Sequence, residues 1–151
     1  MRTSDRELVV GQARALFEGE RDPIANASNL SALIFSTLPN LNWAGFYFVR
    51  GDELVLGPFQ GKPASTRIAR GKGVCGTAWE RRETIVVPDV HAFAGHIACD
   101  SASNSEIVIP LVACGEVIGV LDIDSPILDR FGAEDRHVLE ELARAYIEAI
   151  A

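Results

Sequence analysis

EIVIPLVACGEVIGVLDID, residues 106–124, decides the fold predicted for this chain. Two apolar runs flank the pair at 114–115, and a glycine in a short break between such runs is typical of a β-hairpin. Residues two apart on a strand point to the same side of a sheet, so Asp122 and Asp124 project together. Burying two carboxylates costs free energy unless a cation or hydrogen-bond donors meet them. We therefore expect a binding site there; the alternative is that the strand ends before Asp122 and both acids are solvated.

Whether Glu106 joins the two aspartates depends on the register of this hairpin. With a two-residue turn at 114–115, Glu106 falls on the opposite face from Asp124. A three-residue loop through Glu116, or a bulge near Pro110, places Glu106 opposite Asp124. Facing carboxylates repel each other, so one of them would keep its proton to a higher pH and could act as an acid.

The rest of the chain predicts one α+β domain over residues 1–151, a sheet with helices on one face and a loop-covered pocket on the other. Apolar residues at helical spacing predict a helix ending near Gly19, a second from Asp22-Pro23 to Pro39, and a terminal helix through 138–150. Between the second and the terminal helix we expect strands at 42–49, 53–59 and 84–87, a mostly irregular stretch at 57–76, a short helix at 75–81, and a long loop at 88–105.

Composition excludes several classes of protein. The chain has 14 Lys and Arg against 21 Asp and Glu, a net charge of −7, which disfavours a nucleic-acid partner. Its longest apolar run, 107–114, is far shorter than the roughly 20 residues of a membrane helix. Three cysteines do not make a disulfide framework and favour a reducing compartment. We expect a cytoplasmic protein without a membrane segment.

Two cysteines lie in polar, glycine-rich surroundings that suggest reactive thiols. Cys75 falls at a predicted helix start near Lys72, where backbone N–H groups and a cation would favour the thiolate. Cys99 lies in the long loop, three residues after His96. The alternative is that both are unreactive buried residues. The spacing of His91, His96 and Cys99 matches no strong metal signature, so we expect neither a metal nor a cofactor.

These residues together resemble the free methionine-(R)-sulfoxide reductases, which are single GAF-type domains. The likeness begins at Asn42-Trp43-Ala44-Gly45-Phe46-Tyr47 and continues to the terminal helix. Its most specific pieces are Gly57-Pro-Phe-Gln-Gly-Lys-Pro-Ala64, Gly71-Lys-Gly-Val-Cys75-Gly-Thr77, Asp89-Val-His-Ala-Phe93, Gly95-His-Ile-Ala-Cys-Asp100, Ser105-Glu-Ile-Val108 and Gly119-Val-Leu-Asp-Ile-Asp-Ser125.

The resemblance implies a GAF fold and reduction of free methionine-R-sulfoxide, with electrons from thioredoxin or a similar dithiol. It implies that Cys99 attacks the sulfoxide sulfur and that Cys75 belongs to the redox set. It also implies that the substrate is held by acidic and aromatic side chains, namely Glu106, Asp122, Asp124, Trp43 and Tyr47. The resemblance is also compatible with a homodimer. A zwitterionic substrate fits the acids, because its ammonium group needs acidic partners.

One departure from the family pattern concerns the resolving thiol. Ser65 stands where family members commonly carry a third redox cysteine, and Cys114 lies in a hairpin turn where the family needs no thiol. A serine hydroxyl cannot resolve a sulfenic acid, so we expect Cys75 to form the disulfide with Cys99. Two other functions remain open at this stage: a GAF-type sensor of a small molecule, and a thiol redox switch without turnover.

Overall fold

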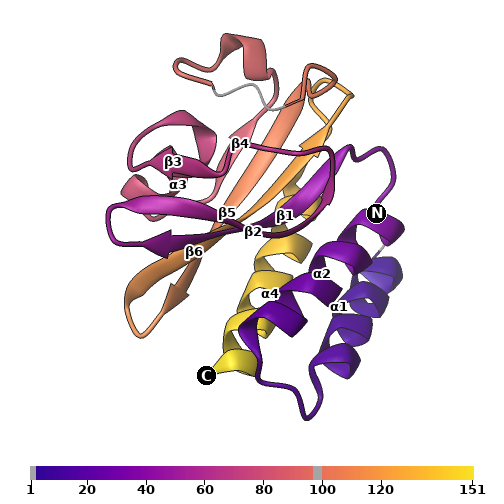
Figure 1. Ribbon diagram of the computed structural model, residues 1–151. Helices are drawn as coiled ribbons and strands as arrows, with labels where there is room; N and C mark the ends of the chain where they lie inside the picture. Colours follow the sequence, from indigo (N-terminus) through magenta and orange to yellow (C-terminus); the bar gives the residue numbers. More distant parts are fainter. Residues whose placement is uncertain (1–2, 97–99) are drawn as a thin grey trace.

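The computed structural model describes residues 3–96 and 100–151, which form a six-stranded antiparallel sheet with strand order β3-β2-β1-β6-β5-β4 (Figure 1). The elements in chain order are α1 (Thr3–Phe17), α2 (Pro23–Thr37), β1 (Trp43–Arg50), β2 (Glu53–Gly61), β3 (Arg67–Ala69), α3 (Gly73–Arg81), β4 (Ile85–Val87), a 3-10 helix η1 (Val90–Ala92), β5 (Ser105–Ala113), β6 (Glu116–Ser125) and α4 (Ala133–Ile150). This confirms the predicted α+β class.

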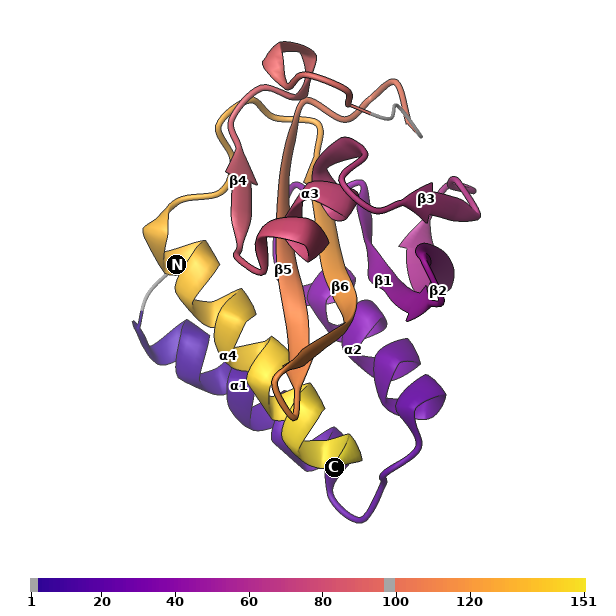
Figure 2. The same cartoon turned by 90° about the vertical axis from the view of Figure 1, so that its left-hand side faces the viewer.

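The sheet separates two apolar cores. Alternate side chains of the central strands, among them Phe46, Ile107 and Leu121, pack with α1, α2 and α4 on one face. Their neighbours in the strands, among them Tyr47 and Val108, pack with α3 on the other face. Figure 1 shows the three long helices on one side of the sheet, and Figure 2 looks at the molecule from the side of α3. The expected helical layer is therefore confirmed, with α3 as an additional helix on the opposite face.

The second helix starts where the sequence predicts it. The Asp22 carboxylate accepts hydrogen bonds from the backbone N–H groups of Ile24 and Ala25, both at 2.9 Å, and Pro23 occupies the first turn. Such an N-cap stabilises a helix by about 1 kcal/mol. The helix ends at Thr37, two residues before Pro39, which cannot continue it.

The register of the β5–β6 hairpin brings Glu106 opposite Asp124. The turn is tight, since Ala113 pairs with Glu116, and a left-handed backbone at both Cys114 (φ 51°) and Gly115 (φ 79°) matches a type I′ turn. The pairing then shifts between residues 111 and 112, which restores the register that a tight turn alone would exclude. Of the two alternatives that would place Glu106 opposite Asp124, the structure thus has the bulge, close to Pro110, and not the three-residue loop.

The stretch 57–76 contains more regular structure than the sequence indicates. Strand β2 continues to Gly61, and the three-residue edge strand β3 pairs with the start of β2, with Ile68 opposite Leu54. The prediction of a mostly irregular segment was wrong there, because so short a strand shows no hydrophobic period and depends on pairing with a distant partner. No helix among residues 3–96 and 100–151 is long and apolar enough to cross a membrane.

Candidate functional site

Three acidic side chains converge on one pocket on the α3 face of the sheet. Glu106 on β5 faces Asp124 on β6, and Asp122 lies two residues earlier on β6. All three line a narrow pocket together with Cys75 and Tyr47. Glu106 and Asp122 are only 5% and 6% exposed, so the alternative of solvated acids does not hold for them. The predicted convergence of the three acids is confirmed.

Cys75 lies directly against this cluster. It is the third residue of α3, and its thiol donates a hydrogen bond to Asp122 Oδ2 at 3.3 Å. Burial raises the pKa of the Cys75 thiol, and the charges of Asp122, Glu106 and Asp124 raise it further. The expectation that the helix start and Lys72 favour the thiolate was therefore wrong. Burial and three nearby acids outweigh the partial charge of one helix end.

The glycines around Cys75 allow the first turn of α3 to pack closely against the preceding loop. A Cβ atom at Gly76 would lie 2.6 Å from the carbonyl oxygen of Ala69, a contact that a side chain cannot make. The Gly71 N–H donates to the carbonyl of Gly76 at 3.0 Å, which binds the preceding loop to the first turn of α3. Cys75 thus lies in the first turn of α3, where the sequence predicts a helix start, but it is packed in the interior and not in the polar surroundings that the sequence suggested.

The described lining of the pocket is rich in acids, and Lys62 approaches it only at the rim, with Nζ 3.9 Å from Asp100 Oδ1. None of the described residues that line it is Lys or Arg. His96 lies near Glu106, with Nε2 3.6 Å from Oε1, but burial lowers the pKa of this histidine. Burial raises the pKa of Glu106, with the charge of Asp124 adding to it, and burial and Glu106 do the same for Asp122. Asp122 Oδ1 is buried without a hydrogen-bond partner.

The rim of the pocket is ordered by Asp100 and Asn42. The Asn42 side-chain amide donates to Asp100 Oδ2 at 3.1 Å and to Ser103 Oγ at 2.9 Å. The backbone N–H of Ala102 donates to Asp100 Oδ1, and this bond, followed by that from Asn42, lowers the pKa of Asp100. Asp100 and Ser103 line the pocket, although the sequence indicated no role there for Asp100, Ser103 or Asn42. The signal available for Asp100 was its place at the end of the motif 95–100.

Cys99 lies outside the described residues. His96 and Asp100 are the nearest described residues before and after it, and both line the pocket.

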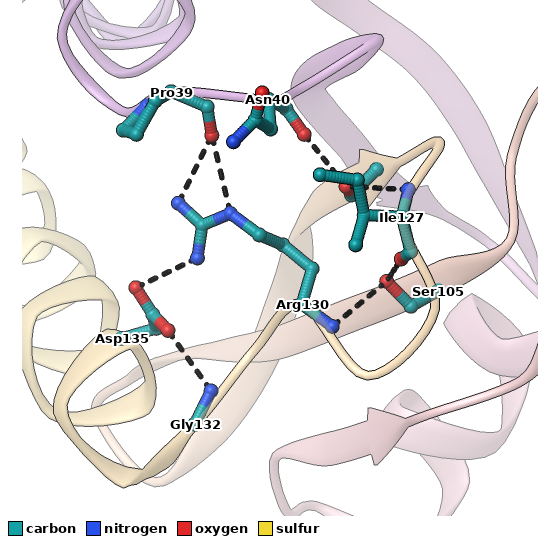
Figure 3. Close-up of polar contacts among 8 residues, drawn as sticks. Pro39, Asn40, Ser105, Ile127, Arg130, Gly132 and Asp135 are labelled. Atoms are coloured by element: carbon teal, nitrogen blue, oxygen red, sulfur yellow. Dashed lines mark hydrogen bonds and ion pairs between the residues drawn. The ribbon is translucent and has the colours of Figure 1, made fainter.

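The ends of the two acid-bearing strands are fastened by buried serine hydroxyls (Figure 3). The Ser105 hydroxyl, next to Glu106, donates to the carbonyl of Ile127 at 2.5 Å. The Ser125 hydroxyl, next to Asp124, donates to the carbonyl of Asn40 at 2.6 Å and accepts from the Ile127 N–H at 3.1 Å. Both serines are fully buried. The sequence analysis missed this network, because its partners are backbone groups of distant loops.

Arg130 extends the same network (Figure 3). Its Nε and Nη2 donate to the Pro39 carbonyl at 3.1 and 3.0 Å, and its Nη1 lies 3.1 Å from the Asp135 carboxylate. Asp135 in turn accepts from the Gly132 N–H at 2.9 Å, at the start of α4. The loop before β1 and the loop after β6 are thus held together next to the acids.

The predicted aromatic residues lie on β1, beside the pocket. Tyr47 lines it, and the Tyr47 hydroxyl donates to the Ser65 carbonyl at 2.9 Å. Trp43 stacks on Tyr47 and Phe59, with ring centroids 6.0 and 5.1 Å away, and its indole N–H donates to the Lys62 carbonyl at 3.0 Å. Trp43 supports Tyr47 and the 62–65 loop without being one of the residues that line this pocket.

The comparisons with known proteins agree with this geometry. A family model described as GAF domain matches residues 25–151. The free methionine-R-sulfoxide reductase of Escherichia coli is 53% identical, over 91% of this chain and 83% of that protein. The chain belongs to the free methionine-R-sulfoxide reductase family of GAF domains.

Two solved structures of similar proteins extend the likeness to nearly the whole chain. The enzyme of Staphylococcus aureus in complex with its substrate is 51% identical with a TM-score of 0.93, covering 97% of this chain and 95% of that one. A candidate GAF sensor protein from Burkholderia vietnamiensis is 59% identical with a TM-score of 0.95, covering 99% and 95%.

Ser65 and Cys114, the two positions that bear on the resolving thiol, lie in different parts of the molecule. The backbone carbonyl of Ser65 accepts a hydrogen bond from the Tyr47 hydroxyl, so the loop that carries Ser65 lies close to the pocket. Cys114 is exposed at the hairpin tip, where Arg82 donates to the Gly115 carbonyl. Along an extended strand of about 3.3 Å per residue, Cys114 lies more than about 20 Å from Asp122.

Proposed function

We propose that this protein reduces free L-methionine (R)-S-oxide to methionine, with Cys99 as the nucleophile and a thioredoxin-type dithiol as the final reductant. The observation that carries the proposal is the cluster of the buried Glu106 and Asp122 with the half-buried Asp124, in a pocket without Lys or Arg among its described lining residues. Related proteins in E. coli and S. aureus carry this activity in their names, and the S. aureus structure holds its substrate.

The cluster suits a ligand that brings a positive charge. The donor oxygens of Glu106 and Asp122 lie within 4.8 Å of each other, so the two ionised carboxylates repel by at least about 3.5 kcal/mol at an effective dielectric constant of 20. An ammonium group between them replaces this repulsion by attraction. A methionine sulfoxide residue within a protein has no ammonium group, and its peptide bond would meet the acids unpaired. The cluster therefore selects the free amino acid.

The chemical step needs one thiolate and one proton donor. The Cys99 thiolate attacks the sulfoxide sulfur, the sulfoxide oxygen takes up a proton, and transfer of that oxygen to Cys99 leaves methionine and a cysteine sulfenic acid. The residues that support this assignment are His96 and Asp100, which lie on either side of Cys99 in sequence and both line the pocket. Glu106 is suited to donate the proton, since burial and Asp124 raise its pKa.

Cys75 is the proposed resolving thiol. Its sulfur attacks the sulfur of the Cys99 sulfenic acid, a disulfide forms, and the oxygen leaves as water. Because the pKa of Cys75 is raised, it must lose its proton during the attack, and Asp122 Oδ2, 3.3 Å away, is placed to accept it. Exchange with an external dithiol then restores both thiols.

The deciding experiment offers each epimer of free methionine sulfoxide, with a dithiol, to the wild type and to Cys99→Ser. We expect methionine from the R epimer with the wild type and none with the variant, while the variant still binds the substrate. The matched control is Cys114→Ser, which removes an exposed thiol far from the pocket. Binding without turnover in the wild type would indicate a sensor, and methionine production by Cys99→Ser would refute the assigned nucleophile.

A further inference from the structure

Three potential metal donors from three different elements meet beneath the pocket. A sulfur of Cys75 on α3 and one carboxylate oxygen each of Glu106 on β5 and Asp122 on β6 all lie within 4.8 Å of one another. All three side chains are buried, and Asp122 keeps a second oxygen, Oδ1, buried without a hydrogen-bond partner. A buried acceptor without a donor is costly, and a cation is one ligand that would satisfy it.

The separation of the Cys75 and Asp122 donor atoms fits a small tetrahedral ion, and Glu106, whose donor oxygen lies within 4.8 Å of both, completes the set after a small side-chain movement. Bonds of about 2.3 Å to sulfur and 2.0 Å to oxygen at tetrahedral angles place the two ligand atoms about 3.5 Å apart. The separation between Cys75 Sγ and Asp122 Oδ2 is 3.3 Å. His96 Nε2 lies 3.6 Å from Glu106 Oε1 but is not one of the three donor atoms that lie within 4.8 Å of one another. A thiolate sulfur among the donors favours zinc over magnesium or calcium.

We propose that the reduced protein binds a divalent thiophilic cation of the zinc type through Cys75, Asp122 and Glu106. Binding breaks the S–H bond of Cys75 and releases its proton to solvent as the metal–sulfur bond forms, with no change in oxidation state. In this position the ion occupies the place of the substrate ammonium, a part of the inference that rests on the proposed function. The metal would therefore compete with methionine sulfoxide and keep Cys75 from forming a disulfide.

Cobalt(II) serves as the spectroscopic probe, because a thiolate ligand gives it a charge-transfer absorption. The full chain is reduced, freed of metal with a chelator and titrated with Co²⁺, and Zn²⁺ is then added to displace it. We expect the absorption in the wild type and in the control Cys114→Ser, and its loss on addition of Zn²⁺. Cys75→Ser should lose the absorption and bind Zn²⁺ at least about 100-fold more weakly, and Glu106→Gln should weaken binding about tenfold or more while keeping the side-chain volume.

The outcomes separate the metal site from the enzymatic proposal. The site would be overturned if Cys75→Ser kept the absorption. The absence of any absorption in the wild type would overturn it too. A loss of the absorption in Cys99→Ser or Cys114→Ser, with Cys75→Ser unaffected, would assign the metal to another thiol. Absorption that depends on Cys75 in a protein that does not reduce methionine sulfoxide would leave the site standing and refute only the competition. If reduction does occur, Zn²⁺ should raise the apparent KM for the sulfoxide, and an unchanged KM at saturating Zn²⁺ would contradict competition.

Discussion

Asp122→Asn should make the protein more stable and a poorer binder of its substrate. In the wild type the Asp122 carboxylate is buried, one of its oxygens has no partner, and Glu106 lies close by. Repulsion from an ionised Glu106 amounts to at least about 3.5 kcal/mol when both groups are charged, and proton uptake relieves part of it. We expect a gain of about 1–3 kcal/mol near neutral pH, equivalent to a rise of about 3–9 °C in thermal midpoint. The asparagine carbonyl can still accept the Cys75 S–H bond, so no packing is lost.

The pH dependence of the stability difference between Asp122→Asn and the wild type is a second test of the predicted stabilisation. Burial raises the pKa of Asp122 in the folded protein, so the folded state binds this proton more tightly than the unfolded state. Ionisation therefore costs stability as the pH rises above the ordinary carboxyl pKa of about 3.9. The advantage of Asp122→Asn should be larger at about pH 7.5 than at about pH 5. Thermal unfolding is followed in chelator-containing buffer, with the exposed Asp52→Asn as the matched control.

Binding completes the comparison. In a Cys99→Ser background, which prevents turnover, calorimetry should show at least a tenfold loss of affinity for methionine-R-sulfoxide, from the loss of a charge-assisted contact worth about 1.5–3 kcal/mol. An Asp122→Asn protein that is less stable than the wild type at about pH 7.5, or that binds the sulfoxide as tightly as the Cys99→Ser parent, would refute the reasoning.

Three further predictions follow from the site. After oxidation by one equivalent of substrate, peptide mapping should find a Cys75–Cys99 disulfide, and a link from Cys99 to Cys114 or undiminished turnover of Cys75→Ser would reject Cys75 as the resolving thiol. Ser125→Ala should raise KM more than it lowers kcat, because the Ser125 hydroxyl fastens the strand end that carries Asp124, and it should cost about 1–3 kcal/mol of stability; equal KM values for variant and wild type would contradict this role. Tyr47→Phe should raise KM by freeing the Ser65 carbonyl while stability falls by about 1 kcal/mol, and an unchanged KM would exclude a role for the 62–65 loop in substrate binding.

The sequence was most informative where a pattern is local. The apolar run of residues 117–124 predicted a strand with two acids on one face, and the Asp22-Pro23 cap predicted the start of α2. The register of Glu106 stayed open, because one inserted residue moves every side chain to the other face. The structure settled it through the bulge at residues 111–112. Local patterns thus fix elements, whereas pairing needs the partner strand.

Cys75 shows why electrostatics resist prediction from sequence alone. Its nearest charged neighbour in sequence is Lys72, but Asp122, 47 residues away, is its hydrogen-bond partner. Proximity in sequence suggested an activated thiolate, and proximity in space produces a protected thiol. The serine and arginine network of Figure 3 was missed for a related reason, since its acceptors are backbone carbonyls that carry no side-chain signature.

The protected thiol gives the proposed cycle an order of events. A bound substrate ammonium favours ionised carboxylates, and burial, followed by the charges of Asp122, Glu106 and Asp124, raises the pKa of Cys75 and favours its thiol form. Departure of methionine removes the ammonium, and the carboxylates then bind protons more tightly because they again face each other without a cation. Asp122 Oδ2, which accepts the Cys75 S–H bond at 3.3 Å, becomes a better proton acceptor at that moment. Cys75 is therefore released to attack the Cys99 sulfenic acid after the product has left, which keeps the resolving thiol from reacting while the sulfoxide is still in the pocket.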